Sequence, residues 1–205
     1  MACLGKGRGG MSIPYRLCLR VVQLALIGLL GLHTGCASLI SNAASGLADQ
    51  LSAAVTNQSD PETVRDGAPA YMLLLDGLLE GNPDDPKLLA AAASLYASYG
   101  AVFADNPNRA ARLTERARHY AERALCISYA QSCQWNGATY EAYEATLAAL
   151  KNKHSNTVYA YSVAWLAYIR THSDDWKALA KLPHLEALLH RYIEISDAAK
   201  ATRSI

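Results

Sequence analysis

The side chains that could act chemically are few and widely spaced in this sequence. His190 and Glu194 are one helical turn apart, a spacing at which two side chains of one helix can contact the same ligand. Such pairs are common on exposed helix surfaces, and we expect this one there. The sequence contains no GxSxG, phosphate-loop, HExxH or dinucleotide-binding motif and no CxxC pair for a metal. We therefore predict no catalytic residue, no metal and no cofactor, and a protein that is not an enzyme.

The cysteine with a specific chemical role is Cys36, which follows a short apolar segment. Residues 21–32 are apolar except for Gln23, basic residues precede them, and no acidic residue comes before Asp49. A membrane-spanning helix needs about 20 apolar residues, so this segment is typical of a secretory signal instead. The segment ends in HTGC, which resembles a bacterial lipobox. We predict a lipoprotein signal peptide at 1–35 and an acylated Cys36; the alternative is a signal cut elsewhere, with Cys36 incidental.

Acylation of Cys36 would tether the protein to a membrane, because buried acyl chains supply the binding free energy. Ala37 follows, where aspartate would indicate retention in the inner membrane, so the outer membrane is favoured. We predict a periplasmic protein with a lead at 36–58 and a helical domain at 59–205. Without the basic signal, acidic side chains outnumber basic ones, so nucleic acid is not an expected partner.

Cys126 and Cys133 could form a disulfide in an oxidising compartment. On one unbroken helix their separation means about 10.5 Å of rise, which is too far for a disulfide. A bond requires the helix to end between them, and Gln131–Ser132 is a suitable place. Two free thiols are the alternative, and both remain open.

Helix-forming residues dominate the rest of the chain, and three helix starts can be read directly. Asp60-Pro61, Asp85-Pro86 and Asn106-Pro107 each place a capping residue before a proline. They predict helices at 61–80, 86–104 and 107–128, and later apolar patterns predict helices at 138–151, 157–171, 174–181 and 184–200. Residues 117–125, ARHYAERAL, have the spacing of the second helix of a tetratricopeptide repeat. The predicted fold is all-α, an irregular tetratricopeptide-like array of helical hairpins.

Two groups of side chains are candidates for binding. Four arginines form a stripe along the helix predicted at 107–128, where they either border the core in solvent or dock an acidic partner. They are Arg109, Arg112, Arg116 and Arg123. The segment 157–169 carries a row of aromatic residues, which line a cavity or an interface, or simply pack in the core. The candidate ligand contacts there are Tyr161, Trp165 and Tyr168.

Three blocks in the same order resemble the T component of TRAP transporters (TatT). They are residues 60–103, RARHYAERALC at 116–126 and residues 164–197, and the resemblance covers 36 to about 200. It implies a periplasmic lipoprotein with a tetratricopeptide-like fold, anchored through Cys36, that assembles as a homotrimer. It also implies pairing with a TRAP-type solute-binding protein, and a tunnel that passes or holds a small organic acid or hydrophobic ligand.

Members of that family generally continue past the RYIEISD block, so this chain is expected to be a C-terminally shortened relative. The alternative function is a generic helical-repeat adaptor lipoprotein in envelope assembly, which would handle no small molecule.

Overall fold

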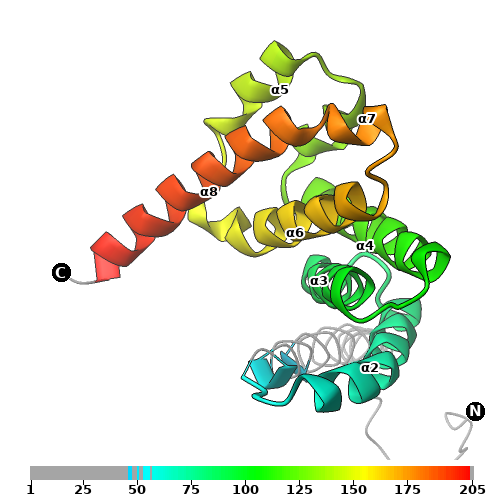
Figure 1. Ribbon diagram of the computed structural model, residues 1–205. Helices are drawn as coiled ribbons and strands as arrows, with labels where there is room; N and C mark the ends of the chain where they lie inside the picture. Colours follow the sequence, from blue (N-terminus) through cyan, green and yellow to red (C-terminus); the bar gives the residue numbers. More distant parts are fainter. Residues whose placement is uncertain (1–45, 48–49, 51–52, 56, 204–205) are drawn as a thin grey trace, which may run out of the picture. The chain divides into compact units, whose positions relative to one another are not determined.

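The computed structural model describes residues 46–47, 50, 53–55 and 57–203, and within these ranges every regular element is helical (Figure 1). In chain order the elements are α2 (Pro61–Gly81), α3 (Pro86–Val102), α4 (Pro107–Ser128), the 3-10 helix η1 (Ala130–Gly137), α5 (Tyr140–Leu147), the 3-10 helix η2 (Asn152–His154), α6 (Ser155–Thr171), α7 (Trp176–Leu179) and α8 (Leu182–Arg203). The all-α prediction is confirmed, and the tetratricopeptide-like arrangement stays a prediction. The signal at 1–35 and Cys36 lie outside the described residues.

The three helix starts predicted from capping residues are confirmed. Asp60, Asp85 and Asn106 are the N-caps of α2, α3 and α4, and a proline follows each of them. Their side chains accept hydrogen bonds from backbone amides two or three residues later, at 2.8 to 3.2 Å. Because these amides have no partner within the helix, the caps define the boundaries locally.

The predicted helix at 138–151 is wrong at its end, because α5 stops at Leu147. Arg191 of α8 donates hydrogen bonds to the carbonyl oxygens of Leu147, Ala148 and Leu150 at 2.9 to 3.1 Å. These carbonyls near the end of α5 therefore find their partner in a distant helix. The helix predicted at 174–181 is shorter than expected, and the final helix starts two residues earlier than predicted, at Leu182.

Helices α3, α4 and α6 contact one another and form the centre of the core, with α2 against α3 and α8 against α6 and α5 (Figure 1). Alanines of α3 are fully buried at this centre: Ala90, Ala92, Ala93 and Ala97. The closest approach is at Gly100, where an added Cβ would lie 3.0 Å from Leu113 Cβ and from Thr114 Cγ2. Small side chains thus allow α3 and α4 to pack at short range.

Two hydroxyl pairs join α4 to α6. The hydroxyl oxygens of Thr114 and Thr171 are 2.6 Å apart, and those of Ser128 and Thr157 are 2.7 Å apart. Thr114 and Ser128 are as far apart along α4 as Thr157 and Thr171 are along α6, and the pairs connect them in reverse order. Helices α4 and α6 therefore run antiparallel, and the two pairs share one register. The hydroxyl groups are satisfied in the buried interface, where an unpaired polar group would be costly.

Candidate ligand cavity

Aromatic rings from three elements gather around Trp135 of η1. The Trp135 ring lies 4.8 Å from Tyr143 of α5, 5.6 Å from Tyr161 of α6 and 6.1 Å from Tyr129, each in edge-to-face geometry. The Trp135 indole also donates a hydrogen bond to Thr146 Oγ1 at 2.9 Å. The contacts with α5 and α6 hold η1 in place, although it has no side-chain cap of its own.

The three predicted ligand contacts lie in one row on α6. Ring centroids are 6.2 Å apart for Tyr161 and Trp165 and 5.7 Å apart for Trp165 and Tyr168. Tyr168 then stacks on His172 at 4.0 Å. The Arg118 guanidinium covers the rings of Trp165 and Tyr168, at 5.2 Å and 4.8 Å. Tyr168 therefore packs against Arg118 and His172, whereas Tyr161 and Trp165 reach the cavity described next.

A small cavity lies where η1, α5, α6 and the start of α8 meet. It is lined by Trp135, Tyr143, Tyr161, Trp165, Lys181, His184 and Leu185. Its volume of about 10 Å³ has room for about one water molecule. Two buried polar atoms at its wall, Trp165 Nε1 and His184 Nδ1, have no hydrogen-bond partner. Because most buried polar atoms in proteins are paired, these two are the groups with which a water molecule in the cavity can form hydrogen bonds.

The cavity wall is almost free of ionised groups. Burial raises the pKa of Tyr143 and of Tyr161, and the nearby Glu122 carboxylate raises that of Tyr161 further. Burial, followed by repulsion from Lys181, lowers the pKa of His184, which is therefore neutral near pH 7. Lys181 is consequently the only lining residue that carries charge at neutral pH.

The Trp165 indole lowers the pKa of Tyr161, against the larger effect of burial. Trp165 Nε1 nevertheless has no hydrogen-bond partner among the described residues.

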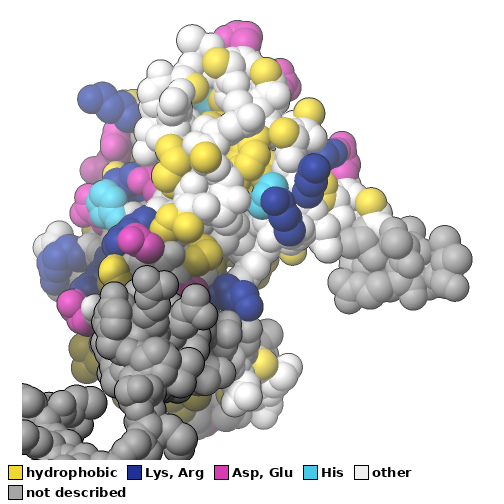
Figure 2. Space-filling model, turned by 180° about the vertical axis from the view of Figure 1, so that it is seen from behind, with side chains coloured by type: hydrophobic (Ala, Val, Ile, Leu, Met, Phe, Trp, Pro, Cys, Tyr) yellow, Lys and Arg dark blue, Asp and Glu magenta, His cyan; other side chains and the backbone are white. Residues whose placement is uncertain are grey.

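The predicted arginine stripe is largely engaged within the chain. Arg116 pairs with Asp76 of α2 at 3.1 Å, and Arg123 pairs with Asp84 at 2.7 Å. Arg109 lies over the Tyr99 ring at 5.2 Å, and Arg112 is exposed. Figure 2 shows basic and acidic side chains intermingled on one flank of the molecule, with hydrophobic side chains gathered beside them.

The structure joins Cys126 and Cys133 in a disulfide, with their Cα atoms 4.7 Å apart. Helix α4 ends at Ser128, between the two cysteines, and this end allows the short distance. The bond links the end of α4 to η1, two residues before Trp135.

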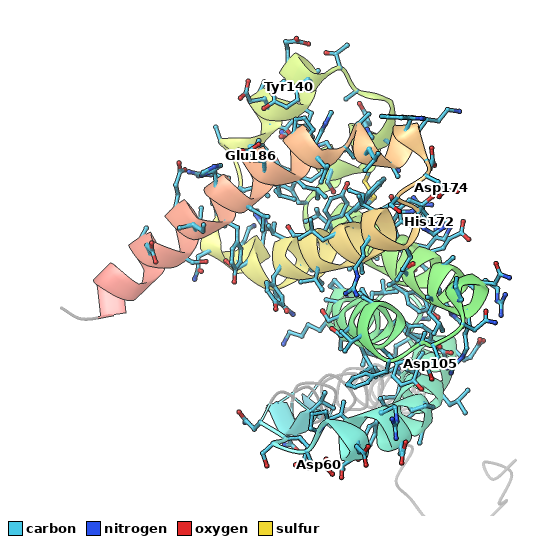
Figure 3. All side chains as sticks on the ribbon, viewed as in Figure 1. Asp60, Asp105, Tyr140, His172, Asp174 and Glu186 are labelled. Atoms are coloured by element: carbon cyan, nitrogen blue, oxygen red, sulfur yellow. A yellow bond between two sulfur atoms is a disulfide. The ribbon has the colours of Figure 1, made fainter. Side chains whose placement is uncertain are left out.

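No metal site is found among the residues that the structure describes. Glu194 binds Arg191 at 2.8 Å. His172 and Asp174 both lie near the turn between α6 and α7, as Figure 3 shows, and they too belong to no such group.

Sequence patterns missed five residues of the cavity wall: Trp135, Tyr143, Lys181, His184 and Leu185. Trp135 is in a 3-10 segment without helical periodicity, and the other four lie on two short stretches far from 157–169. Their aromatic, basic or apolar character was a weak signal, because only the packing of α5 and α8 on α6 brings them together.

The described part of the chain is an all-α protein with a small cavity walled largely by aromatic rings from successive helices. Within the described part of the chain, no helix is both long and apolar enough to cross a membrane. The chain belongs to the TRAP transporter T-component family (TAtT), whose model matches residues 57–199, and the resemblance noted in the sequence is thereby confirmed. No curated protein and no solved structure matches the chain significantly. Membership of this transport accessory family implies a role in TRAP transport systems and a location in the cell envelope.

Proposed function

We propose that the protein is a periplasmic, lipid-anchored accessory component that docks a TRAP-type solute-binding protein and holds a small ligand in its aromatic cavity. The observation that supports the ligand-holding role is the aromatic lining with the unpartnered Trp165 Nε1. The cavity has room for about one water molecule, so a ligand larger than water requires its lining to move apart. Tyr161 and Trp165 contact the ligand, and Tyr168 supports Trp165 from behind.

The surface that meets the solute-binding protein includes Arg109 and Arg112 at the start of α4. Both are exposed, whereas Arg116 and Arg123 hold Asp76 and Asp84 of the same chain. Arginines that remain accessible can pair with carboxylates of a partner, which affects the association rate more than the total affinity. Cys36 supplies the membrane anchor, and the protein assembles as a homotrimer.

Affinity capture from detergent-solubilised envelopes tests the docking role. The tagged wild-type protein should recover a TRAP-type solute-binding protein, identified by mass spectrometry. Charge reversal of Arg109 and Arg112 to glutamate should reduce this recovery several-fold. Arg170→Glu, on the exposed side of α6, is the matched control and should leave the recovery unchanged. Recovery of envelope-assembly proteins in place of a solute-binding protein would favour the generic adaptor function.

Anchoring is tested separately with Cys36→Ser. The variant should move from the membrane to the soluble periplasmic fraction, and mass spectrometry should find acyl chains on Cys36 of the wild type alone. An unmodified Cys36 in the wild-type protein would refute the lipid anchor. Sedimentation of the purified protein tests the trimer.

A further inference from the structure

An open groove of about 400 Å³ lies along α8, where this helix runs beside α6 (Figure 1). Its aliphatic lining consists of Leu166 of α6 and Leu182, Leu185, Leu189 and Ile193 of α8. Leu166, Leu182 and Ile193 are 40, 43 and 55% exposed, so the described part of the chain leaves this row open to water. Contiguous exposed apolar surface of this kind marks a place where a protein contacts another molecule.

The aliphatic row follows one side of α8 for about three turns. Its members on α8 recur every three or four residues, which is the pattern that one helix presents to another helix. From Leu182 to Ile193 the helix rises by about 16 Å. A second helix laid along this side would contact α8 over that whole length and would reach Leu166 at the edge of α6. The groove therefore has the form of a docking site for a helix.

The groove lining also contains two ionisable side chains, Glu186 and His190. Both are exposed, and they lie one helical turn apart on the same flank of α8. Neither takes part in a salt bridge within the described part of the chain. A carboxylate accepts hydrogen bonds, and an imidazole N–H group donates them. This flank thus presents an acceptor and then a donor, in a fixed order along the helix.

That order is complementary to its own reverse. A twofold axis midway between residues 186 and 190 sets two α8 helices antiparallel, so that Glu186 of each copy faces His190 of the other. The midpoint of Leu182 and Ile193 coincides with this axis to within one residue, so the same arrangement packs these two side chains together. A parallel arrangement would instead oppose Glu186 to Glu186, and like charges across an interface are costly.

We propose that the groove is an isologous interface between two copies of this chain, in which antiparallel α8 helices pack along the aliphatic row. Two contacts between Glu186 and His190 flank this row and set its direction. Because the contact extends over only about three turns, it is smaller than a standard interface, and association in the micromolar range is expected. The interface is distinct from the contacts of the proposed trimer: it joins two trimers where these form, and two monomers where they do not.

Sedimentation equilibrium of the purified full chain tests the twofold contact. The experiment is carried out in detergent, so that acyl chains do not drive association, at about 1 to 100 µM protein. The wild type should double its mass by association. Ile193→Asn should raise the dissociation constant about tenfold, because a polar amide replaces an apolar contact. Leu73→Asn makes the same type of change on α2, at a leucine that is 73% exposed and outside the groove, and should have no effect.

Mixing two charge variants tests the antiparallel register. Glu186→Lys and His190→Glu each create two unfavourable contacts in the dimer, so each variant should associate with itself about tenfold more weakly than the wild type. In an equimolar mixture the introduced lysine faces the introduced glutamate, and the two unchanged residues face each other. The mixture should therefore associate at least as tightly as the wild type. Neither variant gains a favourable pair within its own helix, so only a contact between copies produces this recovery.

A mixture that associates no more tightly than its separate components overturns the proposal, as does a wild type without twofold association up to about 100 µM. An Ile193→Asn variant that keeps its mass but no longer captures a solute-binding protein also overturns it, and assigns the groove to that partner. Far-UV circular dichroism checks that every variant is folded. The docking role itself is decided by the capture experiment with Arg109 and Arg112, which lie on α4 and outside this groove.

Discussion

Asp76 of α2 is the residue whose replacement most directly tests how the helices are held together. Its carboxylate accepts hydrogen bonds from the Tyr96 hydroxyl of α3 at 2.6 Å and from the Tyr120 hydroxyl of α4 at 2.9 Å. It also pairs with Arg116 at 3.1 Å. One side chain therefore joins α2 to both neighbouring helices. Burial and the Asp76 carboxylate raise the pKa of Tyr96, so this hydroxyl remains protonated and donates throughout the physiological pH range.

The expected cost of Asp76→Ala follows from these contacts. A hydrogen bond to a charged group contributes about 1.5 to 3 kcal/mol, and the substitution removes two. Part of the lost free energy is regained, because the Arg116 side chain is half exposed and its guanidinium can form hydrogen bonds with water instead. We therefore expect the free energy of unfolding to fall by about 2 to 4 kcal/mol. Asp76→Asn keeps one acceptor oxygen but loses the charge, and should cost about half as much.

Unfolding in guanidinium chloride, followed by far-UV circular dichroism, measures the free energy of unfolding of each variant. The comparison requires that the dependence of this free energy on denaturant concentration is the same in the variant and the wild type. The matched control is Asp84→Ala, which breaks the ion pair between Asp84 and Arg123. The Asp84 side chain is 74% exposed. Exposed pairs contribute about 0 to 1 kcal/mol, so this change should be small. An Asp76→Ala variant no less stable than Asp84→Ala would refute the assignment of α2 attachment to this carboxylate.

Three further predictions concern a bond, a glycine and a histidine. The disulfide between Cys126 and Cys133 closes a short loop, and its loss should lower the free energy of unfolding by about 2 to 3 kcal/mol. Reduction of the wild type and replacement of both cysteines by serine should have this same effect. The serine variant should not respond to reductant. Gly100→Ala should destabilise the protein by about 1 kcal/mol, because crowding against α4 outweighs the gain in helix propensity. Gly77→Ala should stabilise it by about 0.5 to 1 kcal/mol, because no atom lies within 4 Å of the added Cβ. Thermal melts in which both substitutions shift stability in the same direction would contradict this prediction. The pKa of His184 is lowered in the folded chain, so the unfolded chain binds a proton at this residue more readily below about pH 6.5. The free energy of unfolding should therefore fall from pH 7 to pH 5. Unfolding titrations at both pH values should show a smaller fall for His184→Gln than for the wild type.

Local sequence determined the helical character of the chain and the starts of its first three long helices. Asp60, Asp85 and Asn106 act on backbone amides within three residues, so no distant contact is needed to place these boundaries. The succession of family blocks likewise predicted the TRAP transporter T-component family, which the match over 57–199 confirms. Each of these features depends on residues that are neighbours along the chain.

The candidate site was predictable only in its α6 part. The aromatic row of 157–169 made Tyr161 and Trp165 candidates either for a cavity or interface or for plain core packing. In the structure both are buried core residues that also border the small cavity, and their contact with a ligand stays a prediction. The same row gave no means to separate them from Tyr168, which packs against Arg118 instead. That distinction depends on where α4 crosses α6, which helical periodicity does not specify.

Only the tertiary structure decided the remaining features. Arg191 of α8 donates hydrogen bonds to carbonyls at the end of α5, more than 40 residues away in sequence, and Asp76 binds two tyrosines on different helices. Trp135 and His184 meet in one cavity although η1 and α8 carry no common motif. Periodicity specifies which face of a helix is apolar, but not which helix covers that face or at what register. Helix boundaries therefore follow from local capping, whereas the cavity follows from the packing of helices that are far apart in the chain.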